Sequence, residues 1–454
     1  MYEKISIPPI TPSLIKDQFF TVLSVELGNT TIKSIIVTTN IKTNQSFQIN
    51  KLVNLTRDIR PPKESEEVFG YTIWNKELSK EAIEESISKT ILDSLKQVNM
   101  TTQDIDFVVR STGVVAISNL SNEMGLIIKA LSDACLNIGI KPSQMTAPFS
   151  VNNIPEHIRK FSFFNNIQFD GSIVGVAPPK ATGVLSNEME GELVTAGIKL
   201  ASKSSSIDYR NPVISIDMGT TLAGQIIDDS RPYANLLCNY VGLAGGISDI
   251  LLRGCGIIDE NYSTIDIRNP IKTSELNEHK LHEITEKLHA HVDIMEVPSD
   301  VENFGLVNVY SQNKKNNNVK IIGCRINDEK KLVNTFNKYV DVTELDNVML
   351  QIDNFYAYYI KRLIDESKKL NLLSENMTLG ITGRAGTTGQ KPRLIHEYLK
   401  DMFNEIIFAE DGLALGALMM ARCMNSLGTP TNPIGGSKKG FCIMQQRIGL
   451  CKKP

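Results

Sequence analysis

The sequence predicts an α/β protein of two domains that are built alike. Its 454 residues are enough for two to three domains of ordinary size, each with its own apolar core. Short β-branched strands alternate with amphipathic helices along the chain. One strand–turn–strand pattern also occurs twice, with Gly28 and Gly219 at equivalent places. Duplication of one domain explains this repeat; chance is the alternative, because strands joined by a glycine turn are common.

The first domain is expected at residues 21–210, after an N-terminal extension at residues 1–20. The extension contains three prolines and is expected to be an extended segment. A helix is expected to begin after Ser79, a suitable N-cap, because isoleucine or leucine recurs every fourth residue as far as Leu95. The strands expected in this half are 20–25, 34–37 and 107–110.

The second domain is expected at residues 211–428, and a basic C-terminal tail at residues 429–454. A charged segment at about 259–340 is expected to be an insertion in this domain. The other elements follow from helical or β-branched patterns. They are strands at 213–216 and 377–382, a short helix opened by the glycine loop 242–246, and helices at about 342–369 and 411–426.

The charge balance and the cysteine pattern exclude several classes of function. Lys and Arg number 48 against 51 Asp and Glu, a net charge of −3, so no nucleic acid or membrane partner is expected. No apolar run is long enough to span a membrane, and the first residues lack the apolar core of a signal peptide, so a cytoplasmic location is expected. The seven cysteines never form C-x-x-C, so neither a disulfide framework nor an iron–sulfur cluster is expected.

The two repeated turns are predicted to bind the phosphates of a nucleotide. Glycine lets backbone N–H groups approach phosphate oxygens, and threonine or asparagine side chains add donors. An acidic residue precedes each glycine by two positions, Glu26 in one copy and Asp217 in the other, and can hold Mg²⁺. The predicted phosphate contacts are Gly28, Asn29, Thr30, Thr31, Lys33, Gly219, Thr220 and Thr221.

Lys33 and Glu188 each have two interpretations. Lys33 adds positive charge to the first turn if it points inward, and an outward, solvated side chain is the alternative. In the second copy Gly224 is expected at the equivalent place, so no matching lysine is expected. Glu188 and Glu192 are four residues apart and share one helical face, where they can meet a metal or a water together. The alternative is an acidic first helical turn that the helix dipole stabilises.

Glycine turns in the second half are candidates for contact with a nucleoside. The turn at residues 383–389 matches neither a P-loop nor a Rossmann fingerprint. Its bare backbone is suited to seat an adenine or a ribose. The predicted adenosine contacts are Gly245, Gly246, Gly383, Arg384 and Gly386.

Taken in order, these motifs resemble the superfamily of acetate and sugar kinases, heat-shock cognate chaperones and actin (ASKHA). Its pattern has two phosphate hairpins, an adenosine turn and two connecting helices. The matching stretches are 26–33, 188–197, 217–221, 380–386 and 411–421. The resemblance implies a two-domain actin-like ATPase fold, which is a duplicated ribonuclease H-like fold, here with an insertion in the second half.

Over roughly residues 20–425 the chain is similar to the methanogenesis marker protein 14 family of methanogenic archaea. The stretches that carry this likeness are VELGNTTIK, TRDIRPPK, VVRSTGVVA, NEMEGELVTAGIK, SIDMGTT and FYAYYIKRL. The resemblance implies a protein partner in methanogenesis. That family is also distantly similar to ATP-dependent reductive activators of corrinoid proteins.

The resemblance further implies ATP and Mg²⁺ as ligands and roles for single residues. It makes Glu26 and Asp217 the acids that face the metal. Asn187-Glu188 matches the Asn-Glu of chaperone-type members, whose glutamate orients the attacking water, so Glu188 joins Asp217 as a catalytic candidate. Glu26 stands where most members have aspartate, which puts the metal geometry in doubt. The iron–sulfur domain of corrinoid activators has no counterpart here, so another protein would have to deliver electrons.

Three functions remain open from the sequence. The first is an ATP-binding protein that hydrolyses ATP slowly and drives a conformational change on a partner, such as a methanogenesis enzyme or a corrinoid protein. The second is a scaffold or assembly factor with a degenerate nucleotide cleft. The third is a small-molecule kinase, for which Asp170 is the candidate base and a turn-forming role is the alternative. The partner, the oligomeric state and ATP turnover stay undetermined.

Overall fold

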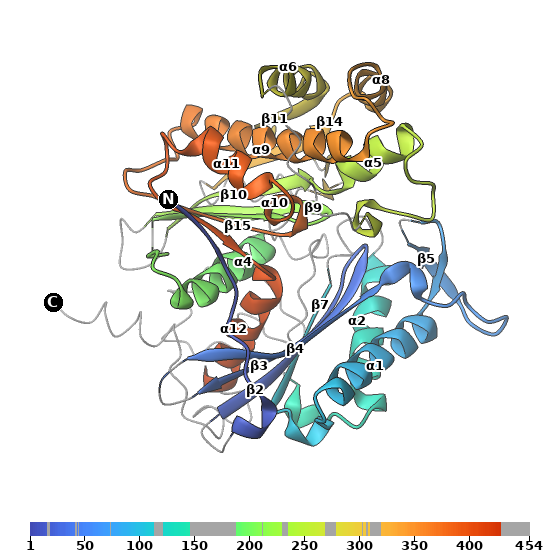
Figure 1. Ribbon diagram of the computed structural model, residues 1–454. Helices are drawn as coiled ribbons and strands as arrows, with labels where there is room; N and C mark the ends of the chain where they lie inside the picture. Colours follow the sequence, from blue (N-terminus) through green and yellow to red (C-terminus); the bar gives the residue numbers. More distant parts are fainter. Residues whose placement is uncertain are drawn as a thin grey trace.

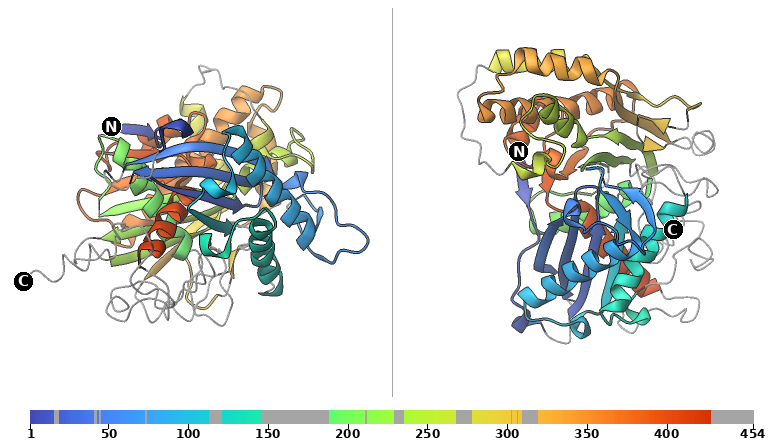
Figure 2. Two further views of the ribbon diagram at one scale, coloured as in Figure 1. Left: turned by 90° about the horizontal axis from the view of Figure 1, so that it is seen from below. Right: turned by 90° about the vertical axis from the view of Figure 1, so that its right-hand side faces the viewer.

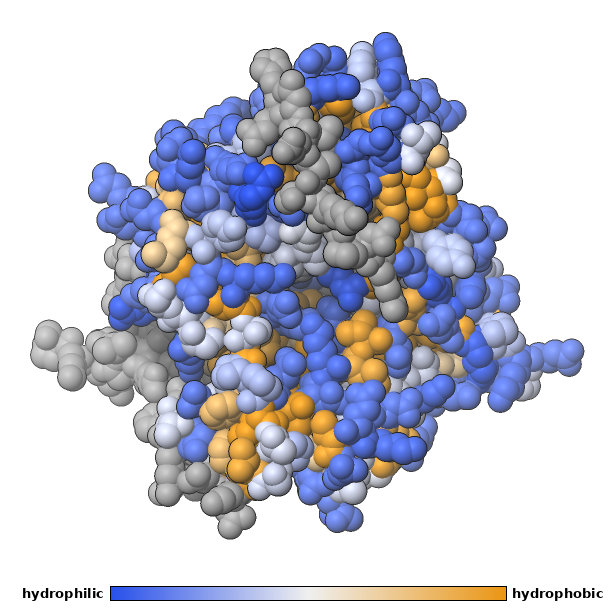
Figure 3. Space-filling model, viewed as in Figure 1, coloured by the Kyte–Doolittle hydropathy of each residue, from blue (hydrophilic) through white to orange (hydrophobic). Residues whose placement is uncertain are grey.

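The structure is a computed structural model of the 454-residue chain. It describes residues 1–15, 19–40, 43, 45–72, 74–112, 121–145, 188–210, 212–228, 235–267, 278–301, 303–305, 307–308 and 319–427. The predicted basic tail, together with Asp170, lies outside these residues. None of the helices in the ranges given combines the length and the apolarity needed to cross a membrane. On the face seen in Figure 3, hydrophilic residues predominate among the residues drawn in colour.

The smaller of two large sheets is built from the first half of the chain. Its strands are β2 (Phe19–Leu27), β3 (Thr31–Asn40), β4 (Ser46–Leu55) and β7 (Phe107–Thr112). They lie in the order β4-β3-β2-β7, with β2 antiparallel to β3 and parallel to β7. A short hairpin of β5 (Val68–Tyr71) and β6 (Glu77–Ser79) follows β4 in the chain.

The larger sheet has eight strands in the order β1-β16-β15-β8-β9-β10-β14-β11. Its centre repeats the smaller sheet, because β8 is antiparallel to β9 and parallel to β15, as β2 is to β3 and β7. The strands are β1 (Tyr2–Ile5), β8 (Val213–Met218), β9 (Thr221–Asp228), β10 (Asn235–Leu243), β11 (Val292–Glu296), β14 (Lys320–Ile326), β15 (Thr378–Thr382) and β16 (Ile406–Ala409).

Helices cover the outer faces of both sheets (Figure 1). On the smaller sheet these are α1 (Lys80–Gln97) and α2 (Ser121–Asn137). On the larger sheet they are α5 (Gly246–Gly254), α6 (Glu278–His289), α8 (Glu329–Tyr339), α9 (Leu345–Lys369) and α11 (Lys391–Leu399). The predicted N-cap of α1 is confirmed, since the Ser79 hydroxyl accepts a hydrogen bond from Ala82 N at 3.2 Å. The stripe from Ile83 to Leu95 is buried against the smaller sheet.

Two helices lie between the sheets and join the halves of the molecule. They are α4 (Glu188–Ala201), which packs on the larger sheet, and α12 (Gly412–Leu427), which packs on the smaller one. Val194 and Ile198 of α4 share one apolar core with Leu415 and Leu418 of α12 and with residues of both sheets. In the right-hand view of Figure 2, the smaller sheet, in blue, lies below the helices that cover the larger sheet, in orange.

The repeated strand order confirms the predicted duplicated α/β fold of two like halves. Within the charged segment predicted as an insertion, β14 and β11 extend the larger sheet beyond β10. The expected N-terminal extension contributes β1, which pairs with β16 at the opposite edge. The domain boundary near residue 210 stays a prediction, because the core between the sheets draws on both halves.

Candidate functional site

A cavity of about 610 Å³ lies where the two predicted phosphate turns meet. Both acids, both turns and part of the adenosine set line it. The predicted residues in its wall are Glu26, Gly28, Asn29, Thr30, Thr31, Lys33, Asp217, Gly219, Thr220, Thr221, Gly245, Gly383 and Arg384. Gly246 and Gly386 stand outside the wall; a Cβ at Gly386 would meet Ile381 and Met218 in the core.

The first turn joins β2 to β3 and is held from both sides. Gly28 N donates to Thr31 O at 2.8 Å, which closes the turn. Thr56, just after β4, donates from its N to Thr30 O at 3.0 Å and from its hydroxyl to Gly28 O at 3.1 Å. These bonds fix the turn in place.

The second turn joins β8 to β9 and is bound to the glycine loop that opens α5. Gly245 N donates to Gly219 O at 2.8 Å, and Ala244 N donates to Thr220 O at 3.0 Å. A Cβ at Gly245 would lie 2.6 Å from Gly219 O, so only glycine permits this approach. Gly383 has φ +80°, and a Cβ there would lie 2.4 Å from Asp217 Oδ1. The carboxylate of Asp217 therefore sits directly against the turn predicted to seat adenosine.

Lys33 points into the cavity, which decides between its two interpretations. It lies directly across from Glu26 on the neighbouring strand, and Nζ is 3.5 Å from Glu26 Oε2. The charge of Glu26 raises the pKa of Lys33 against the opposing effect of burial. The ammonium group therefore remains charged in the cavity.

Asp217 is the corresponding acid of the second turn and is 7% exposed. Burial raises its pKa to about 7, an effect that Lys33 opposes and that the charges of Glu26 and Asp411 reinforce. The residue across from Asp217 on β9 is Ala223. Gly224, which was expected at the place equivalent to Lys33, lies one residue further along, because the second turn is one residue shorter than the first.

Glu190 is a cavity residue that the sequence analysis missed. It is 5% exposed and lines the cavity, and its Oε2 has no hydrogen-bond partner in the part of the chain described. Burial holds the pKa of Glu190 well above its ordinary value, and the charges of Asp217 and Glu26 add to this. The side chains of the predicted Glu188 and its neighbour Glu192 lie outside the described residues.

Close packing of α4 on β9 brings Glu190 to this place. A Cβ on Gly191 would lie 3.0 Å from Gly224 O, and Gly224 itself has φ +142°. One turn later Thr195 accepts a hydrogen bond from Gln225 Nε2 at 2.9 Å. Gly191 and Thr195, four residues apart, mark the face of α4 that meets the sheet. This spacing is the sequence signal that points to Glu190, which adjoins that face.

The carboxylate oxygens in the cavity are suitable ligands for a Mg²⁺ ion that phosphate oxygens also hold. No three of His, Cys, Asp and Glu converge as a metal-binding group within the ranges that the structure covers. Mg²⁺ commonly takes one or two carboxylates and completes its shell with water and phosphate oxygens. The Oε2 atoms of Glu26 and Glu190 are buried without a hydrogen bond, although the former has its ion pair with Lys33. Glu26 and Asp217 offer the hard ligands that such an ion prefers, and Glu190 adds a buried oxygen without a hydrogen bond to the same cavity.

A buried ion pair fixes the adenosine turn to α9. Lys391 Nζ lies 2.5 Å from Asp353 Oδ1, and both side chains are almost fully buried. Asp353 Oδ2 also accepts from Gln390 N at 2.6 Å. Apolar Met349 and Ile352 of α9 line the same end of the cavity. This end combines an apolar wall with polar groups whose positions are fixed.

Comparison with known proteins places the chain among archaeal relatives. It is 45% identical to an uncharacterized protein, MJ1451, of Methanocaldococcus jannaschii, over 95% of this chain and 91% of that one. It is 44% identical to an uncharacterized protein of Methanothermobacter thermautotrophicus, over 96% and 84% of the two chains. A solved structure with a similar arrangement is the activator of the 2-hydroxyisocaproyl-CoA dehydratase from Clostridium difficile with bound ADPNP. It shares 12% identity and a TM-score of 0.37 over 88% of this chain and 94% of that one.

Residues 19–451 match the family described as an uncharacterized protein conserved in archaea, DUF2114. The match spans most of the chain, including both turns and both helices between the sheets. The chain belongs to this archaeal family.

Proposed function

We propose that this protein binds Mg-ATP in the cavity between its two sheets and hydrolyses it slowly, using closure of its halves to act on a protein partner. The observation that carries the proposal is the meeting of two equivalent turns, from separate sheets, in one cavity with buried carboxylates. A ligand that contacts both turns stabilises the closed arrangement, and its loss releases it.

Each residue has a role that follows from its type and place. Backbone N–H groups and hydroxyls of the two turns donate to phosphate oxygens, and Lys33 adds positive charge. Glu26 and Asp217 hold Mg²⁺, which when bound neutralises phosphate charge. Glu190 accepts a hydrogen bond from a water and orients it. Glu188 stays the alternative for that role.

Calorimetric titration with Mg-ATP tests nucleotide binding. The wild-type protein is expected to bind with a Kd below about 1 mM. Binding should be tighter at pH 8 than at pH 6, because Asp217, with a pKa of about 7, must lose its proton to become a metal ligand. No heat of binding at about millimolar nucleotide, at either pH, would refute the proposal.

Glu190→Gln tests whether the cavity hydrolyses ATP. Phosphate release is expected to fall by about 10²-fold or more, the usual loss for an acid–base or water-orienting group. Mg-ATP affinity should change by only about threefold, because the amide preserves the shape of the side chain. Glu192→Gln is the matched control on the same helix, and Glu188→Gln tests the alternative residue. A drop in phosphate release in Glu188→Gln alone would assign the water-orienting role to Glu188. No phosphate release from the wild-type protein would favour the scaffold function.

The setting of this activity is a second part of the proposal. We propose a role in methanogenesis, as a member of the marker protein 14 group that acts on an enzyme or corrinoid protein partner. Support comes from the sequence stretches that carry that resemblance and from the source organisms of the two relatives. Co-purification of the protein from native methanogen cells, with and without Mg-ATP, would identify the partner. A nucleotide-dependent association is the expected result.

A further inference from the structure

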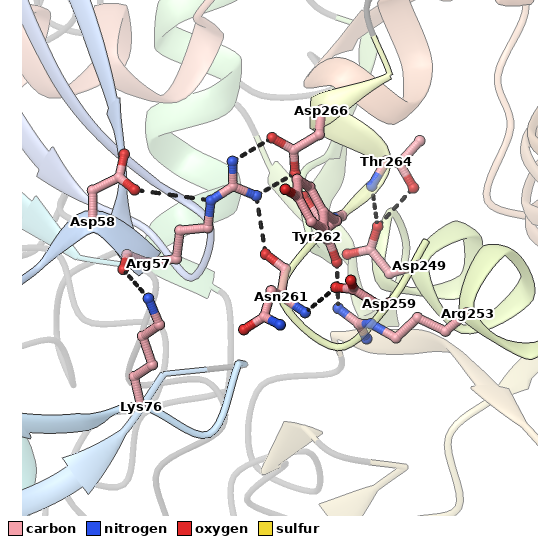
Figure 4. A network of polar contacts seen from close by, with 11 residues as sticks. Arg57, Asp58, Lys76, Asp249, Arg253, Asp259, Asn261, Tyr262, Thr264 and Asp266 are labelled. Atoms are coloured by element: carbon pink, nitrogen blue, oxygen red, sulfur yellow. Dashed lines mark hydrogen bonds and ion pairs between the residues drawn. The ribbon is translucent and has the colours of Figure 1, made fainter. Parts of the chain in front are cut away.

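One edge of the cavity is formed by a short segment, residues 259–267, that follows α5. Within it Ser263, Thr264 and Ile265 line the cavity, and the last two belong to the 3₁₀ turn η10 (Thr264–Asp266). Asp249 of α5 holds this turn, because its Oδ1 accepts from Thr264 N at 2.7 Å and from Thr264 Oγ1 at 2.6 Å (Figure 4). The segment is therefore attached to the half that contains the larger sheet.

Arg57 reaches this segment from the other half of the molecule. It lies in the 3₁₀ turn η2 (Thr56–Asp58), directly after β4. Its NH1 donates to Asp266 Oδ2 at 2.5 Å and its NH2 to Asp266 Oδ1 at 2.6 Å, and Figure 4 shows the two groups facing each other. Each side chain is only 17% exposed. Such a bidentate, charge-assisted pair is stronger and more directional than an ordinary surface ion pair.

Neighbouring side chains hold Arg57 in the position from which it makes this contact. Its guanidinium lies 5.1 Å from the ring centre of Tyr262 and 6.0 Å from that of Trp74. NH1 also donates to Asn261 O at 3.1 Å, and Lys76 Nζ donates to Arg57 O at 2.9 Å. Trp74 lies on the same half as Arg57, whereas Tyr262 and Asn261 belong to the segment that carries Asp266. The contacts with Tyr262 and Asn261 therefore add to the pair across the cleft.

Each end of this contact is next to a phosphate turn. Thr56, the neighbour of Arg57, makes the two bonds that hold the first turn. Thr264 Oγ1 lies 2.9 Å from Ser248 Oγ, and the Ser248 hydroxyl donates to Gly245 O. Gly245 N in turn donates to Gly219 O of the second turn. In Figure 1, α4 and α12 lie to the left of α5 and β5. The contact therefore spans the cleft away from the helices that connect the halves.

We infer that Arg57 and Asp266 form a clasp across the cleft that limits how fast the cavity exchanges its nucleotide. The inference rests on the proposed function. Separation of the halves on this side requires loss of the bidentate pair, and the cavity edge at Ser263 and Thr264 moves only when it is lost. The clasp thereby controls the rate of exchange and the time for which the closed form lasts.

Asp266→Asn tests the clasp through the dissociation rate of a fluorescent ATP analogue, measured with Mg²⁺ by chase with unlabelled ATP. The variant keeps an oxygen for Ser263 N, which donates to Asp266 Oδ2 at 2.9 Å, but loses the ion pair. Dissociation is expected to become about tenfold faster. Asp58→Asn is the matched control, since it removes the same charge from an exposed residue 3.9 Å from Arg57 on the same half. Equal rates in the two variants would overturn the inference.

A second measurement needs no nucleotide and separates the clasp from the proposed function. Amide hydrogen exchange of the unliganded protein is expected to speed up at residues 261–267 in Arg57→Gln, by about tenfold, and to stay unchanged in Asp58→Asn. Failure of wild type to bind any nucleotide would refute the proposed function. Unchanged exchange at 261–267 in Arg57→Gln would refute the clasp, whatever the nucleotide result.

Discussion

Asp217→Asn is expected to abolish Mg-ATP binding and, at pH 8, to make the unliganded protein more stable than wild type. The carboxylate of Asp217 is buried among other acids, and its pKa is about 7 in the folded state against 3.8 ordinarily. Above about pH 4 the unfolded chain ionises this group while the folded protein still holds the proton. Asp217 therefore does not reduce the free energy of unfolding below about pH 4, and it reduces that free energy progressively as the pH rises to about 7.

Asparagine removes this dependence because it stays neutral in both states. The gain at pH 8 is on the order of 2–4 kcal/mol, and it should vanish near pH 4. Thermal unfolding in EDTA at both pH values, beside calorimetry with Mg-ATP, measures the two effects. Asp208→Asn is the control of opposite sign, because Arg210 lowers the pKa of the exposed Asp208. An Asp217→Asn protein that binds Mg-ATP normally, or that melts earlier than wild type at pH 8, would contradict the expectation.

If the opposite effects on stability and binding are observed, they will assign Asp217 to ligand binding and not to the stability of the fold. A buried carboxylate that weakens the fold at neutral pH is retained when its charge is needed for a ligand. Glu190 has the same character, with a raised pKa and an unpartnered oxygen. Structural ion pairs such as Lys391 with Asp353 have a counter-charge at 2.5 Å within the fold. Among the main charges that act on Asp217 in the described part of the chain, Lys33 is positive and Glu26 and Asp411 are negative, so negative charge remains for a cation to neutralise.

Local chemistry in the sequence predicted the two turns and the elements around them. The pattern of an acidic residue, a glycine and hydroxyl residues between two β-branched runs indicates a turn from local sequence alone. The face of α4 that enters the cavity depends instead on how closely the helix approaches β9, which Gly191 and Gly224 permit. Helical spacing alone pairs Glu188 with Glu192 and gives no reason to choose Glu190. Residue spacing shows which side chains share one face of a helix, but it does not show which other element that face contacts.

Long-range pairing and turn length were the other limits of prediction. Arg57 and Asp266 are 209 residues apart, and each sits in a stretch with ordinary loop composition. Their contact exists only because both halves fold. Gly224 was predicted at the place equivalent to Lys33 by counting from each turn glycine, which assumes turns of equal length. Strand register follows turn geometry, and one residue fewer puts Ala223 at that place.

Gly416→Ala is expected to destabilise the protein by about 3 kcal/mol, the upper range for forcing an extra methyl into a packed interior. A Cβ at this position would lie 1.7 Å from Leu193 O on α4. The reciprocal contact has the same form, because a Cβ on Gly197 would lie 1.7 Å from Gly412 O. The two helices touch backbone to backbone, so neither can yield to a methyl group without moving apart. Separation would also open the core that Val194 and Leu415 share.

Gly70→Ala is the matched control, since a Cβ there meets nothing within 4 Å. Its free energy of unfolding, from urea denaturation, should lie within about 0.5 kcal/mol of wild type. Gly416→Ala should also weaken Mg-ATP binding, because α4 holds Glu190 and the chain reaches α12 through Asp411, which lines the cavity. Equal stability of the two alanine variants would mean that α4 and α12 are not in direct contact.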